Sequence, residues 1–181
     1  IREVDAIVEV VRAFENADIH HVAGRINPLE DRDIIHTELV LADLDTAERA
    51  VTRQEKEAKT GGEREKKKLE MYKNIQHHLA SGKLASNLPV ADEENNKSIR
   101  ELQLLTSKPI LFAVNVLDTE DQKAKSLLQT FGAARSLLLN IKLEDEISQM
   151  DEGAGELKDM SHIDELIKKL QRLSAIERMD F

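Results

Sequence analysis

Apolar residues follow two patterns along this chain: short continuous runs, and long stripes at helical spacing. Three short runs lie at 7–11, 110–116 and 136–141, and each is nearly continuous rather than alternating. Continuous apolar runs are typical of strands that are covered on both faces of a parallel sheet. We therefore predict three buried strands and, with the helices described next, an α/β fold.

Two helices are predicted to accompany these strands. Residues 119–122 have the spacing of a capping box, apolar residues follow at helical spacing, and Gly132 is a stop signal, so the second and third runs enclose a βαβ unit. A second amphipathic helix is predicted after Ser161, with an apolar stripe that would cover the sheet. Its members are Ile163, Leu166, Ile167, Leu170 and Leu173.

The segment between the first two strands carries two long helical stripes. One runs through about 31–59, the second begins after the turn at 60–62, and Gly82 ends it. Two amphipathic helices joined by a short turn form an antiparallel hairpin. We predict a projecting helical arm that is closed by a short return helix at about 92–102.

Composition limits the class of protein. With 181 residues, 40% hydrophobic and 34% charged, the chain can bury one core and has room for a second small module. No apolar stretch approaches the roughly 18 residues needed to span a bilayer, so no membrane partner is expected. The absence of cysteine excludes disulfides and thiolate zinc sites and fits a cytoplasmic protein.

Charge is unevenly distributed. The formal net charge of −9 argues against nucleic-acid binding by the whole surface, yet residues 49–68 have a local balance of +4. One interpretation is an ordinary solvated helical face, and the other is a docking tip for a ribonucleoprotein or a protein. The basic residues are Arg49, Arg53, Lys56, Lys59, Arg64, Lys66, Lys67 and Lys68.

Topology indicates a binding site. Asn115 and Asn140 fall at the carboxyl ends of consecutive strands, where α/β sheets bind ligands, so we expect them to converge. In Asn115-Val116-Leu117-Asp118 the amide can pair with the Hoogsteen edge of a purine, and Asp118 can accept from guanine N1–H and N2–H₂. The alternative is that Asn and Asp are common turn residues after a strand.

No glycine of the chain opens a G-x-x-x-x-G-K-[ST] phosphate loop, and the chain starts at Ile1 without methionine. We therefore expect a part of a larger nucleotide-binding protein. Metal chelation by the pairs His20-His21 or His77-His78 is disfavoured, because neighbouring side chains on a strand or helix point to different sides.

Four stretches resemble the YchF-type Obg-like ATPases, a translation-factor class of P-loop proteins. They are 1–7, 10–16, 18–24 and 37–45. The resemblance is specific over 1–50, weakens through the arm, resumes at 104–109 and continues loosely to Phe181.

The resemblance implies a partial P-loop-type parallel sheet with flanking helices, a G-domain, at 1–30 and 103–181. An inserted antiparallel coiled-coil arm would occupy 31–102. The phosphate loop and magnesium ligands would lie before Ile1, and a ubiquitin-like TGS domain after Phe181.

The same resemblance assigns individual residues. Asn115 and Val116 match the family's N-x-x-E motif, whereas Asp118 departs from its usual Glu, so ATP and GTP both stay open. Asn140 and Ile141 stand at the fifth G motif, where the family usually has Ser-Ala.

His21 occupies the position of a loop histidine associated with hydrolysis, where a neutral imidazole orients or deprotonates water. Without the resemblance, His20 and His21 would be ordinary surface histidines.

Two main hypotheses follow. The first is a fragment of an ATPase/GTPase that takes ATP or GTP with magnesium and engages the ribosome or ribosomal RNA through its basic arm tip. This fragment is predicted not to hydrolyse nucleotide alone. The second is a non-catalytic helical-hairpin interaction module, and a degenerate remnant with an empty base pocket is a further alternative.

Overall fold

A computed structural model describes residues 4–15, 26–89, 93–149 and 161–179. The chain divides into two compact units, one built from 6–32 and 110–178 and the other mainly from 33–109.

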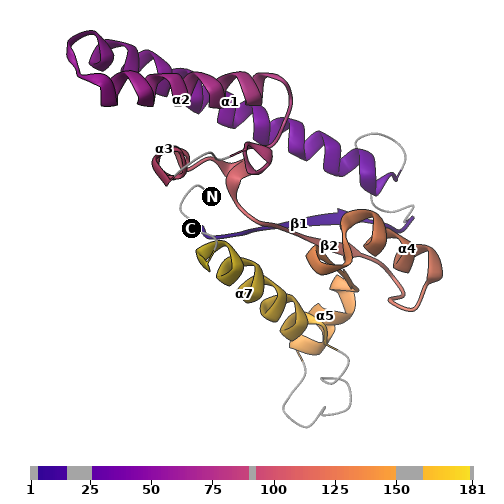
Figure 1. The fold of residues 1–181 in the computed structure, drawn as a ribbon. Helices are drawn as coiled ribbons and strands as arrows, with labels where there is room; N and C mark the ends of the chain where they lie inside the picture. The colour runs from indigo at the N-terminus through magenta and orange to yellow at the C-terminus, as the bar shows by residue number, and fades with distance from the viewer. Residues whose placement is uncertain (1–3, 16–25, 90–92, 150–160, 180–181) are drawn as a thin grey trace. The chain divides into compact units, whose positions relative to one another are not determined.

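The first unit contains a three-stranded parallel sheet in the order β1-β2-β3 (Figure 1). The strands are β1 (Ile7–Arg12), β2 (Ile110–Asn115) and β3 (Ser136–Leu139). The prediction of three parallel strands in an α/β fold is confirmed. The predicted third strand was too long, because Asn140 leaves the sheet and caps a helix.

Burial differs between the strands. Every residue of β3 is buried and only Asn115 of β2 is partly exposed, as the continuous apolar runs predict. β1 instead alternates, and its Val8 and Val10 are 36% and 52% exposed. The prediction of cover on both faces is therefore wrong for β1, because the apolar cluster on that face of the sheet includes strand residues of β2 and β3 but none of β1.

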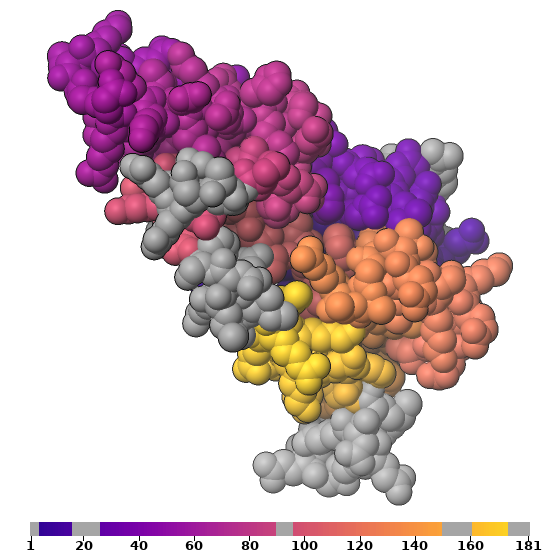
Figure 2. All heavy atoms as spheres, in the orientation of Figure 1, coloured from indigo at the N-terminus to yellow at the C-terminus, as the bar shows by residue number. Residues whose placement is uncertain are grey.

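Helices cover the two faces of the sheet. On one face α4 (Gln122–Phe131) packs against β2, with the rings of Phe131 and Phe112 4.8 Å apart. On the other face α7 (Ile163–Met179) contributes Leu166, Leu170 and Leu173 to a cluster with β2 and β3. Figure 2 shows α7 in yellow beside the orange residues that follow β2. The predicted covering helix is confirmed.

The ends of α4 are set by local chemistry. Asp121, rather than the predicted Thr119, is the N-cap, since its carboxylate accepts from the backbone N–H groups of Lys123 and Ala124 at 2.6 and 3.0 Å. The helix stops at Gly132, whose φ of +88° is readily adopted only by glycine.

The second unit is built on a helical hairpin. α1 (Pro28–Thr60), which begins in the first unit, and α2 (Glu63–Ala80) are joined at 61–62 and followed by α3 (Glu93–Leu102). Short 3₁₀ turns lie at Ala85–Asn87 and Leu105–Ser107. A Cβ on Gly61 would lie 2.8 Å from the carbonyl oxygen of Glu57, so the tight turn requires glycine there.

α1 starts three residues earlier than predicted. Asn27 and Glu30 form a reciprocal cap, in which Asn27 Oδ1 accepts from the Glu30 N–H and Asn27 Nδ2 donates to the Glu30 carboxylate. Pro28 occupies the first helical position, where its missing N–H has no cost.

The core of the hairpin is apolar with a few buried polar anchors. Tyr72, Ile75 and Leu79 of α2 are almost fully buried against Val40 and Ala47 of α1. A second set of contacts fixes the register, because the buried Gln54 donates to the Glu65 carboxylate at 2.7 Å. None of the described helices combines the length and the apolar character that a membrane crossing requires.

Candidate functional site

Two loops meet at the carboxyl ends of β2 and β3. Asn115 Oδ1 accepts from the backbone N–H of Ile141 at 3.3 Å, and Asn140 Nδ2 donates to the carbonyl oxygen of Leu117 at 2.8 Å. These reciprocal hydrogen bonds tie the loop after β2 to the loop after β3. The two asparagines are therefore part of one structure, although 25 positions separate them in the chain.

Asn140 also begins a helix. Its Oδ1 accepts from the N–H of Leu143 at 3.1 Å and thereby caps α5 (Ile141–Ser148), a helix that the sequence analysis did not predict. The same side chain thus supplies a cap through its oxygen and a loop tie through its nitrogen.

Val116 and Asp118 have structural partners as well. The N–H of Val116 donates to Leu139 O at 2.8 Å, which continues the sheet pairing, and its side chain is 3% exposed. Asp118 Oδ1 accepts from the N–H of Glu120 at 2.8 Å, as in an Asx turn. Each carboxylate oxygen has two lone pairs, so this turn leaves acceptor capacity on Asp118.

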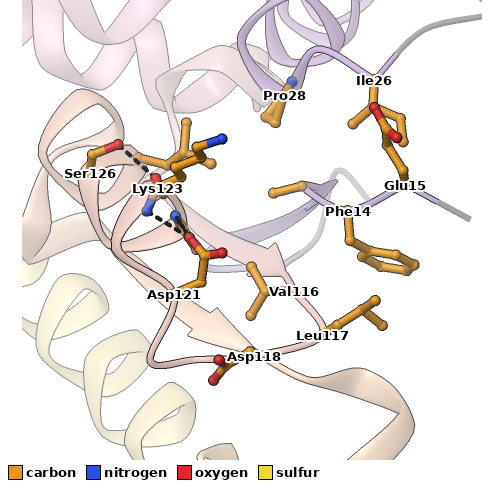
Figure 3. Close-up of a pocket in the computed structure, with 13 residues that line it drawn as sticks. Phe14, Glu15, Ile26, Pro28, Val116, Leu117, Asp118, Asp121, Lys123 and Ser126 are labelled. Atoms are coloured by element: carbon orange, nitrogen blue, oxygen red, sulfur yellow. Dashed lines mark hydrogen bonds between the residues drawn. The ribbon is translucent and has the colours of Figure 1, made fainter.

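A pocket of about 520 Å³ lies beside these loops (Figure 3). Figure 3 shows Phe14 and Leu117 close to one another on one side, with Asp121 and Lys123 at the start of α4 on another. Its full lining is Ala13, Phe14, Glu15, Ile26, Pro28, Val116, Leu117, Asp118, Asp121, Lys123, Ala124, Ser126 and Leu127.

The apolar wall was missed by the sequence analysis. Phe14 lies just after β1, and Ala13 N donates to Asn115 O at 2.9 Å, which brings this segment to the edge where β2 ends. The guanidinium of Arg12 lies 5.8 Å from the centre of the Phe14 ring. The carboxyl-end rule, applied to β1 as it was to β2 and β3, would have found Phe14.

The charged groups of the pocket are mixed. The lining includes three carboxylates, on Glu15, Asp118 and Asp121, and one ammonium group, on Lys123. Asp121 is occupied as the cap of α4. Within the described ranges no cluster of three or more His, Asp or Glu side chains could hold a metal ion, and His21 lies outside those ranges.

The predicted basic tip separates into two groups of residues. Arg49 pairs with Asp45 at 2.8 Å and Lys66 with Glu63 at 3.1 Å. Lys68 lies 2.6 Å from Glu101, and this contact raises the pKa of Lys68. The second group has no ion pair within the part of the chain that the structure describes, and all of its members are exposed: Arg53, Lys56, Lys59, Arg64 and Lys67.

Comparison with known proteins finds relatives that are named as ATPases. It is 36% identical to the ribosome-binding ATPase YchF of Bacillus subtilis, over 93% of this chain and 50% of that protein. It is 31% identical to Obg-like ATPase 1 of Saccharomyces cerevisiae, over 99% of this chain and 47% of that protein. The chain therefore spans about half the length of the curated relatives it matches.

The fold has a solved counterpart. The structure of the Schizosaccharomyces pombe YchF GTPase superposes with a TM-score of 0.75 at 24% identity, covering 96% of this chain and 51% of that one. At this identity the likeness establishes the fold. No protein-family model matches the chain.

Proposed function

Because the chain belongs to the YchF-type Obg-like ATPase family, we propose that it is the purine-binding segment of an ATP- or GTP-hydrolysing protein that associates with ribosomes. Residues 1–30 and 103–181 would form part of the G-domain, and 31–102 the inserted arm. Cytoplasmic localisation follows from a ribosomal partner.

The observation that carries this proposal is the pair of hydrogen-bonded loops beside an apolar pocket. Its volume lies within the range of small-molecule sites, roughly 300–1,000 Å³. A planar base placed against Phe14 and Leu117 would stack on an aromatic face and cover an exposed leucine. Asn115 does not line this pocket itself but directly precedes Val116, which does. Its oxygen holds Ile141, so its Nδ2 group would be the donor for a purine acceptor at the edge of the pocket.

Asp118 does not decide whether the site prefers adenine or guanine. A carboxylate recognises guanine through two adjacent N–H donors, and adenine presents no such pair. One oxygen of Asp118 already accepts from Glu120, which weakens a two-oxygen contact without removing it. The proposal therefore covers ATP and GTP, with magnesium accompanying the phosphates.

His21 is proposed as the residue that positions the attacking water. The support is its place in the family's loop sequence, since this residue lies outside the described ranges. Phosphoryl transfer depends mainly on positioned charge and on the orientation of the nucleophile. Replacement of His21 by alanine in the full-length protein should lower the hydrolysis rate while leaving nucleotide affinity unchanged.

For the arm we propose contact with ribosomal RNA through the five exposed cations that make no ion pair in the described residues: Arg53, Lys56, Lys59, Arg64 and Lys67. Phosphate groups attract such cations strongly, whereas lysines and arginines already paired with carboxylates offer less. The names of the bacterial relatives, ribosome-binding ATPases, support a ribosomal partner.

The alternative hypothesis, a non-catalytic hairpin module, is not favoured. Similarity to the Bacillus subtilis protein covers 93% of the chain, so it includes residues well beyond the hairpin. Titration of the chain with fluorescent ATP and GTP analogues tests the proposal. Binding that is lost in Asn115→Ala supports it, and absence of any purine binding by the full-length protein contradicts it.

A further inference from the structure

Glu144 is a buried carboxylate in α5 that makes no contact with the pocket. Its side chain is 8% exposed, and it lies one helical turn after Asn140 and Ile141. A carboxylate is rarely buried unless its oxygens are hydrogen-bonded. The identity of its partners therefore shows what the residue does.

Those partners stand at the start of α7. Glu144 Oε2 accepts from Ser161 Oγ at 2.7 Å, and Glu144 Oε1 accepts from the backbone N–H of His162 at 2.7 Å. His162 Nδ1 lies 3.6 Å from the same Oε1 atom. Hydrogen bonds to an ionised carboxylate are stronger than neutral ones, and a negative charge is favoured at a helix N-terminus.

α7 is itself fixed to the sheet. Lys169 Nζ donates to the carbonyl oxygens of Ser136 at 2.7 Å and Ala133 at 3.3 Å, at the start of β3. Leu166 and Leu170 pack on the same face of the sheet. α7 therefore gives α5 a fixed point of attachment, and Glu144 is the polar link between the two helices, which lie next to each other in Figure 1.

α5 has only eight residues and carries the loop contacts at its first turn. Its other buried side chain of note, Ile147, packs without directional bonds. A rotation of α5 would displace the Ile141 N–H from Asn115 Oδ1 and the Asn140 amide from Leu117 O. Directional contacts at Glu144 are what oppose that rotation.

We propose that Glu144 is a positioning residue for the purine site, which holds α5 against α7 so that Asn140 and Ile141 keep the loop of Asn115 in place. This inference rests on the proposed function of the site. Glu144 acts through other residues, since it does not line the pocket.

The test uses nuclear magnetic resonance on the 181-residue chain without nucleotide, then nucleotide titration. In Glu144→Ala, the side-chain amide signal of Asn115 should shift and the Ile141 amide should exchange with solvent at least fivefold faster. Any purine nucleotide that binds the wild-type chain should bind at least fivefold more weakly. Asn115 belongs to β2, and its hydrogen bond goes to Ile141, whereas Glu144 binds Ser161 and His162, so the Asn115 signal reports transmission through α5.

Glu146→Ala is the matched control, because Glu146 lies in the same helix and is more than half exposed. It should leave both signals and the affinity within twofold of wild type. Glu144→Gln keeps one acceptor oxygen and should give an intermediate effect. An unchanged Asn115 signal and unchanged Ile141 exchange in Glu144→Ala would overturn the proposal.

Two further outcomes are also decisive. If the amide of Val114 in β2 loses its protection from exchange, Glu144→Ala has unfolded the sheet. The variants Ser161→Ala and Glu144→Gln then test the proposal, through the same Asn115 amide signal and Ile141 exchange rate. If no variant or wild-type chain binds nucleotide, the proposed function fails in this chain, while the response of Asn115 still decides the role of Glu144.

Discussion

Asp43 and Thr106 are bound to each other by two hydrogen bonds, although 63 positions separate them in the chain. Asp43 Oδ2 accepts from the Thr106 N–H at 2.7 Å and from Thr106 Oγ1 at 2.8 Å, while its Oδ1 accepts from the Leu105 N–H at 2.8 Å. Thr106 Oγ1 in turn accepts from the N–H of Ala85 at 2.9 Å. Both residues are fully buried, so this cluster joins α1 to the two 3₁₀ turns of its unit.

Replacement of Asp43 by alanine should therefore destabilise the helical unit. The change leaves buried donors on Leu105 and Thr106 without an acceptor, at a cost of about 3 kcal/mol in the free energy of unfolding. Urea denaturation followed by circular dichroism measures it. Asp45→Ala removes an exposed ion pair and should cost less than about 1 kcal/mol. Equal losses in the two variants would contradict the role assigned to Asp43.

Asn115→Ala should weaken purine nucleotide binding by at least about tenfold, equivalent to about 1.4 kcal/mol. The variant loses the proposed base donor and also frees the Ile141 N–H that holds the loops together. Isothermal calorimetry with ATP and with GTP gives both affinities. Asn74→Ala, an exposed position on α2, serves as control. An unchanged affinity in Asn115→Ala would remove this residue from the site.

Phe14→Ala should reduce affinity for either nucleotide, because stacking of a base on an aromatic side chain contributes about 1–3 kcal/mol. Phe14→Tyr keeps the ring and should retain most of the affinity. Fluorescence titration of the two variants compares them directly. Similar losses in both would show that Phe14 supports the fold of the pocket and does not stack on the base.

The Lys68–Glu101 pair gives a pH dependence with a defined sign. The hydrogen bond from Lys68 lowers the pKa of Glu101 below its usual 4.5, despite partial burial, and Tyr72 Oη donates to the same oxygen at 3.3 Å. A lowered folded-state pKa stabilises the fold above pH 4.5, and that contribution is lost as the pH falls through the folded pKa.

The corresponding experiment compares wild type with Glu101→Gln. The difference in unfolding free energy should be present at pH 7, amount to about 1 kcal/mol or less because the pair is partly exposed, and shrink below pH 4.5. Glu70→Gln, at an exposed position of α2, is the control. A difference that grows on acidification would refute the assigned sign.

Reversal of charge at Arg64 and Lys67 should weaken binding to ribosomal particles and reduce its salt dependence. Each lost phosphate contact lowers the slope of log affinity against log salt by roughly 0.9 for a duplex. Lys83→Glu alters an exposed cation just after α2 and should have a smaller effect. No change in the double variant would leave a solvated helical face as the explanation of the charge run.

The helices and strands were largely predictable because their apolar periodicity depends on neighbouring residues. The hairpin, its turn at Gly61, the return helix near 92–102 and the covering helix after Ser161 all followed from local pattern. Asp43 could not be identified in this way, since its partners lie in distant 3₁₀ turns. A buried aspartate in a helical stripe gives no local sign of what it binds.

In the candidate site, too, local pattern predicted some features, whereas contacts between distant segments could not be predicted. Strand ends identified Asn115 and Asn140, because the carboxyl ends of parallel strands share one edge. The reciprocal ties to Ile141 and Leu117 depend on where two loops meet in space, which no spacing encodes. For Asn140 the strand pattern was misleading, since its neighbour Ile141 extends an apolar run that the cap interrupts.

The alternating exposure of β1 has a consequence for handling the chain in solution. β1 lies at one edge of the described sheet, and its Val8 and Val10 present exposed apolar surface there. Such an edge favours strand-to-strand association between copies. At low ionic strength the net charge of −9 keeps copies apart. Added salt screens that repulsion, so colloidal stability of this chain should fall in the high-salt buffers commonly used to suppress ionic contacts.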